Sequence, residues 1–479
     1  MMNTFFKTSL LLIVLSGLVI LVSCKDDPEL PENLTAFESD QLGLASAETE
    51  LAINLQLTRE AEVEGTATIL IEPTGLTYGT DFTTEPNATA NSFAITIPAG
   101  ATTASFKVKK TAGALFDGDE KIKFTISSLA PSLVVGTKKE LTVTFAEIIA
   151  ASGAFEINGG GALYPNKVFI DLSANRQTAI ARTSWDLAFS SSADEFRVIL
   201  NSPNGMLARA LDKTDLNAVT AADTVGFGAQ LSLNAIFSAI TTSPLPEWVK
   251  TATAWMDSPT GDWSKTAIAS VSTTLAENKV YIINRGTGAG SPSPALGWKK
   301  IRVIRNGSNY TLQHADIGAT TFTEVQVTKN TEYRFQYVSF ATGVVSVEPA
   351  KTKWDIAWTG FTNTTPIDAT NVVPYYFQDV ILSNTAGVQA VQVLTSAVSY
   401  EAFAEANITG LSFSTSQIAI GSAWRSGGGP GTSPSIRADR FYVIKDIDGN
   451  YYKVKFTALT TNGERGKPQI AFALVKKAS

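Results

Sequence analysis

Very few side chains in this 479-residue sequence are histidine, cysteine or methionine, and none of its many acidic pairs has the spacing of a glycoside-cleaving site. The chain has one histidine, His314, and one cysteine, Cys24, and beyond the first two positions its methionines are Met206 and Met256. A Ser-His-Asp triad needs a positioned imidazole, and only one is available. The sequence contains no His-Glu-x-x-His motif, no cysteine pair and no phosphate-cradling glycine loop before a helix. We therefore do not expect an enzyme.

The elements that must position these residues are strands, and one strand motif occurs twice. Residues 185–189, Trp-Asp-Leu-Ala-Phe, return 169 positions later as Trp-Asp-Ile-Ala-Trp at 354–358. Upstream, 168–173 aligns with 335–340, and downstream 196–201 aligns with 378–383. Side chains alternate along a strand, so Trp, Leu and Phe are predicted on one face and Asp and Ala on the other. The motif predicts a central, half-buried strand of a duplicated β domain.

The composition favours an all-β extracellular protein. Charged residues make up 17% of the chain and apolar residues 44%, and helical periodicity is scarce. Only 231–240 and 399–406 suggest short helices. The formal net charge of −6 offers no basic surface, so nucleic acid is not an expected partner. We expect a β-sandwich over 41–149 and two tandem units over 153–320 and 321–477.

The first 23 residues have the pattern of a secretion signal. Lys7 precedes an apolar run, 10–22, that is too short and wrongly flanked for a membrane span. The run ends Leu-Val-Ser before Cys24, which resembles a bacterial lipobox, and residues 25–27, Lys-Asp-Asp, resemble the surface-export tag of Bacteroidetes lipoproteins. We expect lipid on Cys24 to anchor the protein in the outer membrane, facing outward, with 24–40 as a flexible tether. The alternative is a plain signal peptide with a chance cysteine.

Part of the N-terminal region resembles a Calx-β domain. The matching stretches are 78–82, 95–100 and 115–120, set among alternating strands and glycine turns. The resemblance implies a β-sandwich, and Asp81 and Glu120 correspond to calcium ligands of the family's binding members. The acidic pair usual before Leu115 is replaced by Thr-Ala-Gly-Ala at 111–114, which leaves too few acidic ligands for a calcium cage. We expect a spacer without bound calcium.

The remaining two-thirds resembles the HmuY family of haem-binding lipoproteins. The resemblance rests on the Trp-Asp strands and on a closing hairpin at 441–456, whose Asp-Gly turn at 448–449 is a strong hairpin signal. The first unit keeps a degraded hairpin at 280–303. The resemblance implies an all-β fold in which long loops grip a planar ligand and loop side chains bind haem iron.

The iron ligands that the resemblance implies are only partly available. The family's pair of histidine ligands is excluded, because the chain has one histidine. That residue, His314, lies in a predicted strand, where we expect a surface position or a hydrogen-bonded imidazole. Thioethers also bind haem iron, so haem is a candidate cofactor held by Met206 and Met256. Their counterparts in the second unit are Val388 and Arg425, which places any haem in the first unit. Alternatively, each methionine fills a gap in the core.

A second hypothesis is a surface binding, adhesion or scaffold lipoprotein that takes a glycan or protein partner instead of haem. Several tryptophans lie in or near loops, where they could stack on sugar rings or on a macrocycle: Trp248, Trp255, Trp263, Trp298 and Trp424. Trp255 and Trp424 occupy equivalent places in the two units and are the ligand-contact candidates. Their equivalent places in the two units also suggest that Trp255 and Trp424 have a structural role in the fold.

Overall fold

The computed structural model describes residues 31–45, 48–112, 114, 120–145, 150–428 and 432–478. Strands dominate, which confirms the all-β prediction. The chain divides into two compact units, one ending at Phe145 and the other holding all later residues together with Gln41–Gly43. The predicted first helix forms as α2 (Leu233–Ala239), followed by α3 (Glu247–Lys250). The second prediction, 399–406, was wrong, because only a 3-10 turn at Glu405–Asn407 forms there.

The N-terminal unit consists of two five-stranded sheets, in the orders β5-β7-β3-β1-β9 and β2-β10-β8-β4-β6. Phe106 of one sheet contacts Phe93 and Phe124 of the other, so apolar side chains meet between the sheets. The strands are β1 (Leu34–Phe37), β2 (Gln41–Gly43), β3 (Glu50–Leu57), β4 (Gly65–Thr74), β5 (Phe82–Glu85), β6 (Ser92–Ile97), β7 (Thr103–Lys110), β8 (Lys121–Ala130), β9 (Val134–Val135) and β10 (Glu140–Thr144). Because β1 starts at Leu34, part of the expected tether 24–40 belongs to a sheet.

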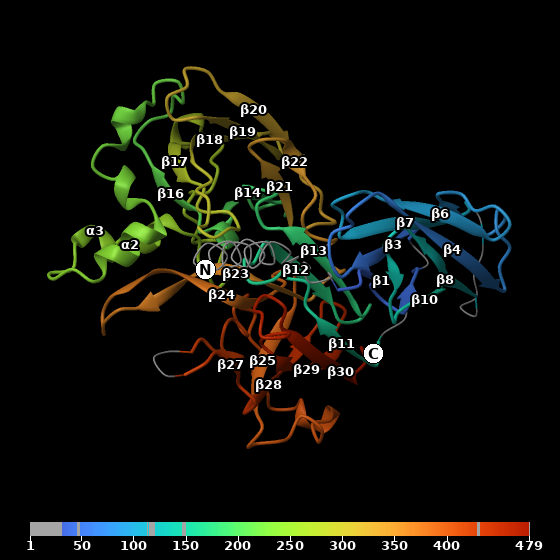
Figure 1. Cartoon of the computed structure of the whole chain (residues 1–479). Coiled ribbons are helices and arrows are strands. Elements are labelled where there is room, and N and C mark those ends of the chain that lie inside the picture. The colour runs from blue at the N-terminus through green and yellow to red at the C-terminus, as the bar shows by residue number, and fades with distance from the viewer. Residues whose placement is uncertain are drawn as a thin grey trace, which may run out of the picture. The chain divides into compact units, whose positions relative to one another are not determined.

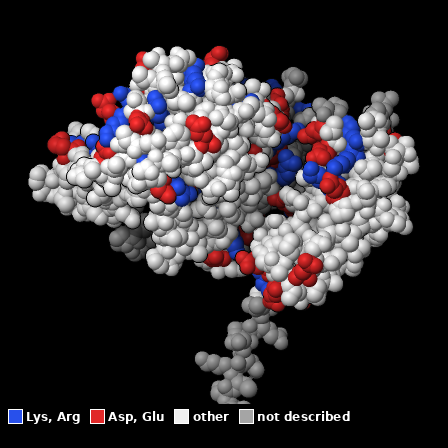
Figure 2. All heavy atoms as spheres, turned by 90° about the horizontal axis from the view of Figure 1, so that it is seen from above, with Lys and Arg blue, Asp and Glu red and all other residues white. Residues whose placement is uncertain are grey.

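Several charges on the N-terminal unit form ion pairs. Lys107 lies 2.6 Å from Glu50, and Lys123 lies 2.6 Å from Glu72, on the outward faces of the strands. On the face shown in Figure 2, blue and red side chains are interspersed and large areas carry no charge. Exposed pairs of this kind contribute little to stability, typically under about 1 kcal/mol.

The C-terminal unit contains four large sheets (Figure 1). Sheet I has the order β11-β30-β29-β28-β25, sheet II β13-β12-β23-β24, sheet III β15-β14-β21-β22 and sheet IV β16-β17-β18-β19-β20. The strands of sheets I and II are β11 (Ser152–Glu156), β12 (Asn166–Asp171), β13 (Arg176–Ala181), β23 (Ile356–Pro366), β24 (Val372–Ser383), β25 (Gln389–Leu394), β28 (Arg440–Lys445), β29 (Tyr451–Ala458) and β30 (Gln469–Lys476). Those of sheets III and IV are β14 (Leu187–Ser190), β15 (Val198–Leu200), β16 (Leu207–Ala210), β17 (Val280–Asn284), β18 (Trp298–Asn306), β19 (Asn309–Ala315), β20 (Thr323–Val327), β21 (Phe335–Ser339) and β22 (Gly343–Val345). A short pair, β26 (Arg425–Ser426) and β27 (Ser435–Ile436), completes the unit.

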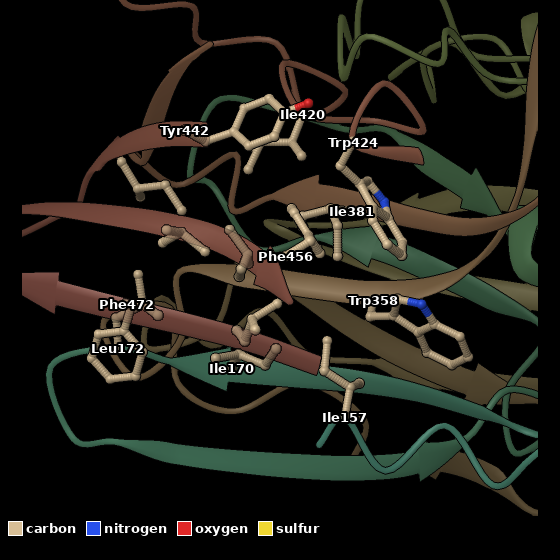
Figure 3. Close-up of a cluster of buried hydrophobic side chains, with 14 of the residues drawn as sticks. Ile157, Ile170, Leu172, Trp358, Ile381, Ile420, Trp424, Tyr442, Phe456 and Phe472 are labelled. Atoms are coloured by element: carbon tan, nitrogen blue, oxygen red, sulfur yellow. The ribbon is translucent and has the colours of Figure 1, made fainter. Parts of the chain in front are cut away.

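The cores show how the four sheets stack. Sheets I and II share a core that includes Trp358, Trp424 and Phe456 (Figure 3). Sheets II and III share a second core, and sheets III and IV a third. The order of layers is therefore I, II, III, IV. The two inner sheets are buried on both faces, and such strands read as continuous apolar runs.

The Trp-Asp strand differs from its prediction in two ways. It is buried on both faces and not half-buried, because it lies in an inner sheet. Leu187 and Phe189 face sheet IV, whereas Trp185 packs with Ala188 toward sheet II. Regular alternation fails at Trp185 because β14 begins only at Leu187. Trp185 and Trp354 are core residues, as the sequence indicated.

Strand pairing between the two copies is reciprocal. In the inner sheets β12 pairs with β23 and β21 pairs with β14, so each copy's leading strand joins the other copy's Trp-Asp strand. We call residues 185–347 body A, and residues 150–181 with 354–478 body B. Body A is thus nested within body B. The expected boundary at 320–321 falls between β19 and β20, which are neighbours in sheet IV.

The observed strand pairing aligns the two copies one residue away from the alignment that the sequence predicted. Leu187 pairs with Val338, and Ile356 pairs with Ile170, so Ile170 corresponds to Val338. Downstream, Leu187 pairs with Leu200 and Ile356 with Ser383, which makes Asn201 and Asn384 equivalent. The predicted alignment was wrong because strands with apolar residues on both faces do not reveal their register.

The equivalent residues of the two bodies make the same contacts. The side-chain amide of Asn201 donates to the carbonyl oxygen of Trp185 at 2.7 Å, and that of Asn384 donates to Trp354 at 2.9 Å. Asp186 accepts the backbone N–H of Phe340 at 2.8 Å, and Asp355 accepts that of Leu172 at 2.8 Å. Each Trp-Asp motif therefore holds the leading strand of the other copy in place.

Candidate functional site

The two candidate thioethers lie on opposite faces of sheet IV. Met206 packs with Ala208 in the core between sheets III and IV, whereas Met256 packs with Leu207 on the outer side of sheet IV. Ala208 and Leu207 are neighbours in β16, and successive side chains of a strand point to opposite faces. Both methionines are buried, at 1% and 5% exposure. The structure does not bring the two sulfur atoms together.

His314 is buried in β19, contrary to the expected surface or satisfied position. Its ring lies 5.1 Å from that of Phe340, and its Nδ1 has no hydrogen-bond partner among the described residues. Burial lowers the pKa of His314, and the nearby Lys299 acts in the same direction. The imidazole is thus held neutral within a sheet and not on a ligand-facing loop.

The predicted ligand-contact tryptophans are core residues. Trp424 is fully buried, stacks on Phe456 at 4.1 Å and donates its indole N–H to the carbonyl oxygen of Asp379 at 3.0 Å (Figure 3). Trp255 is 6% exposed and stacks on Trp248 at 6.0 Å. Neither indole is available to stack on a ligand, because other aromatic rings already cover it.

The remaining predicted site residues lie in or before the N-terminal unit. Asp81 accepts the backbone N–H of Thr77 at 2.7 Å, which closes a local turn. No group of three or more His, Cys, Asp or Glu side chains that could hold a metal occurs within the described ranges. Glu120 is described at the start of the segment that leads into β8. Cys24 lies outside the described residues, as do 115–119 of the Calx-β-like segment.

A cavity of about 420 Å³ lies where loops of bodies A and B meet. We call it the junction cavity. Body B contributes Tyr164 and strand β24, and body A contributes the turn at Asn204, the start of α2 and the loop between β17 and β18. Helix α2 packs against β24 beside this opening (Figure 1). The volume of the junction cavity lies within the roughly 300–1,000 Å³ range of small-molecule sites.

Arg182 fixes the loops that form this cavity. It is buried in the crossover from β13 to β14, and its Nε donates to the carbonyl oxygen of Tyr164 at 2.9 Å. Its Nη1 lies 3.1 Å from the carbonyl oxygen of Pro203 and 2.7 Å from that of Thr287. The same nitrogen is 2.7 Å from Oδ1 of Asn204. One guanidinium thus joins three chain segments from both bodies.

Asn204 presents an unused donor in the cavity lining. The side chain is 2% exposed, its Oδ1 accepts from Arg182, and its Nδ2 has no partner among the described residues. A buried amide N–H without an acceptor costs on the order of 1–3 kcal/mol. A polar ligand oxygen or an ordered water in the cavity would satisfy it.

Trp298 connects the junction cavity to a second, more open one. It begins β18, is half-buried, and lines both the junction cavity and a cavity of about 580 Å³ that we call the outer cavity. The outer cavity is otherwise formed mainly by residues 224–230, and 232–234 of the same segment line the junction cavity. Trp298 was among the loop tryptophans that the sequence singled out.

A smaller cavity, of about 70 Å³, lies between inner sheets II and III. We call it the inner cavity. Glu348 accepts the backbone N–H of Phe335 at 2.7 Å and the hydroxyl of Tyr337 at 3.0 Å, and burial raises the pKa of Glu348 to about 7. Burial likewise raises the pKa of Asp257 to about 7, although Leu200 and Ala267 donate backbone N–H groups to it. This cavity is too small for a macrocycle.

Sequence patterns did not single out Arg182 or Asn204. Asn204-Gly205 was recognised only as a turn, and Arg182 stands in an otherwise ordinary Arg-Thr-Ser segment. The bond from Arg182 to Thr287 joins residues 105 positions apart. One available signal was that Arg182 and Lys351, both basic, each lie three residues before a Trp-Asp motif.

Comparison with protein families matches the chain to the family described as HmuY protein, over residues 163–291 and 296–472. These two segments contain the two Trp-Asp motifs and together cover more than half of the chain. Comparison with curated proteins gave no match.

Solved structures resemble the chain only distantly. The apo form of the Calx CBD1 domain is 13% identical with a TM-score of 0.21, and the match covers 24% of this chain and 96% of that domain. A putative carbohydrate binding protein from Bacteroides ovatus is 8% identical with a TM-score of 0.16, covering 73% of this chain and 97% of that protein. We draw no functional conclusion from similarity at this level.

Proposed function

The chain belongs to the HmuY family, and on that premise we propose that it is a surface lipoprotein that binds a ligand in the junction cavity and catalyses no reaction. The observation that carries this proposal is the buried, unpartnered amide of Asn204 in the lining of a ligand-sized cavity. Arg182 supports it, because a buried guanidinium that joins both bodies preorganises the surrounding loops.

Haem is the ligand that the family resemblance implies, but Met206, Met256 and His314 are not placed to bind its iron. Met206 and Met256 lie on opposite faces of a sheet, and His314 is enclosed in that sheet. The described residues lining the three cavities include no histidine, methionine or cysteine. Thioether-bound haem remains a prediction that no observation tests, and the arrangement of the methionines gives it no support.

Haem titration with conservative variants tests the thioether hypothesis. Met206→Leu and Met256→Leu remove the sulfur while nearly conserving volume, so the core should tolerate them. We expect the haem absorption spectrum to respond identically in the wild type and in both variants. A Soret shift that appears in the wild type and disappears in either leucine variant would establish thioether ligation and overturn the placement of the ligand in the junction cavity.

A ligand screen with a blocked cavity tests the proposed site itself. Asn234 is an exposed residue of α2 in the cavity lining, so Asn234→Trp should fill the cavity without disturbing the core. Ser238→Trp on the same helix is the matched control, because Ser238 is exposed and lines none of the three cavities. Compounds that raise the melting temperature of the wild type and of the control should fail on Asn234→Trp. Ligands that stabilise all three proteins equally would contradict the proposal.

The location of the protein is part of the same proposal. We propose that lipid on Cys24 attaches the chain to the outer membrane and that the binding unit faces the outside. No helix within the described residues is long and apolar enough to span a membrane. The N-terminal unit, which we propose to be Calx-β-like, would then serve as a spacer between anchor and binding unit.

A further inference from the structure

The lining of the junction cavity is polar, and most of its polar groups are uncharged. Its polar side chains are amides and hydroxyls, including those of Asn234, Ser293 and Gln378. The one cationic side chain in the lining, Arg182, already donates to four oxygen atoms. These four oxygen atoms are neutral and no Asp or Glu lines the cavity, so Arg182 keeps its charge, but it is one cation among many uncharged amides and hydroxyls. A ligand with several carboxylates or phosphates would meet a single counterion there. The cavity therefore suits a neutral ligand rich in hydrogen-bonding oxygens.

Trp298 supplies the apolar part of the site. Its side chain is half-buried, and it lines the junction cavity on one side and the outer cavity on the other. A flat indole presents a large apolar area, which can pack against the C–H face of a ring. The combination of amide donors and an aromatic platform matches a sugar ring, which has hydroxyls at its edge and C–H groups on its faces.

The wall of the site continues past Trp298. One chain segment lines both cavities, with residues 224–230 in the outer cavity and 232–234 in the junction cavity. The amide of Asn284 donates to the carbonyl oxygen of Leu231 at 2.8 Å, which fastens this segment to the end of β17 at the point between the two cavities. The two cavities, of about 420 and 580 Å³, therefore adjoin along one wall.

We propose that the ligand is a neutral oligosaccharide that crosses Trp298, with one sugar ring on the indole and neighbouring units in both cavities. This proposal rests on the proposed function, since it assigns a ligand class to the same site. A single sugar would occupy only part of the available surface. Affinity should therefore rise with the number of sugar units until both cavities are filled.

Isothermal titration of the soluble mature protein with neutral glucan, xylan and chitin oligosaccharides, from two to six units, tests the inference. In the series that binds, we expect longer chains to bind more tightly than the disaccharide. Trp298→Ala should weaken binding of the longest chain by about tenfold or more. Trp248→Ala is the matched control and should leave binding unchanged, because Trp248 is half-buried but lines none of the three cavities.

A second variant separates the two cavities. Ala229 is exposed and lines only the outer cavity, so Ala229→Trp should lower the affinity for long chains to that of the disaccharide and leave the disaccharide unaffected. No binding by any of these saccharides would overturn the oligosaccharide proposal. The screen could instead yield compounds that stabilise the wild type, do not stabilise Asn234→Trp and are not sugars. That result would support the binding site and contradict the proposed ligand class. If no compound depends on Asn234, both proposals fail together.

Discussion

Glu348 makes the stability of the C-terminal unit dependent on pH. Burial raises the pKa of this carboxyl to about 7, above the roughly 4.3 of an exposed glutamate. The resulting stabilisation is complete at pH values below the unfolded pKa and is lost as the pH rises through about 7. We expect the free energy of unfolding to fall between pH 5 and pH 8, with this residue contributing on the order of 3 kcal/mol. Chemical denaturation at both pH values measures the change.

Glu348→Gln is the informative variant for that measurement. A glutamine can still accept from the backbone of Phe335, and the Tyr337 hydroxyl can turn to accept from the new amide. The variant should therefore show a smaller decrease in stability between pH 5 and pH 8. A decrease remains, because burial raises the pKa of Asp257 and of Asp355 as well. An unchanged pH dependence would show that Glu348 does not titrate as its surroundings indicate.

Asn201 and Asn384 should both be important to stability. Besides the tryptophan carbonyls, Asn201 donates to the carbonyl oxygen of Arg182 at 2.8 Å, and Asn384 donates to that of Lys351 at 2.8 Å. Alanine at either position leaves two carbonyl groups without a donor, at a cost of roughly 1–3 kcal/mol. Urea denaturation of each variant measures this cost. Asn217→Ala is the control, since Asn217 is exposed and a surface change there should stay within about 0.5 kcal/mol.

At the scale of residues, the sequence allowed only part of the candidate site to be predicted. Trp298 was one of the tryptophans predicted to lie in or near loops, and it does line two cavities. Met206 and Met256 drew attention by their rarity, yet they are packed in separate cores. Asn204 and Arg182 matter through contacts between distant segments, and local patterns carry no information about those.

At the scale of elements, strand positions were easier to predict than strand partners. The closing hairpin formed as expected, with Lys445 paired to Tyr451 around the Asp-Gly turn, because turn chemistry acts locally. Which strands meet in the inner sheets depends instead on contacts between residues more than a hundred positions apart. An inner strand with two apolar faces fits several partners equally well, so its pattern could not decide between consecutive and nested copies.

Fragments of the chain distinguish nested from consecutive copies. Residues 185–347 contain all strands of sheets III and IV, so we expect this fragment to fold. Residues 153–320 lack β20 and β21 and carry β12 without its partner β23. That fragment should aggregate or remain unfolded, because the edge of β14 that pairs with β21 and the edge of β12 that pairs with β23 would both be exposed. Dispersed amide signals in an NMR spectrum of 153–320, with none for 185–347, would contradict the nesting.

At the scale of the whole molecule, the lipid anchor is the first property to test. Replacing Cys24 by serine removes the only thiol in the chain and hence the only site for thioether-linked lipid. We expect the Cys24→Ser protein to move from the membrane fraction to the soluble fraction. Protease added to intact cells should digest the wild-type protein if the binding unit faces outward. A wild-type protein that resists protease until the cells are lysed would place it on the inner side.

The first and last strands of the C-terminal unit are hydrogen-bonded neighbours, with Ser152 opposite Ala473 in an antiparallel pair. Tension that reaches the unit through its N-terminal end would therefore pull at one end of this strand pair. The hydrogen bonds between the two strands would then break one after another. Body A, joined to the rest through its two crossovers, would not bear this load first. We expect such tension to separate β11 from β30 first and to leave the junction cavity intact.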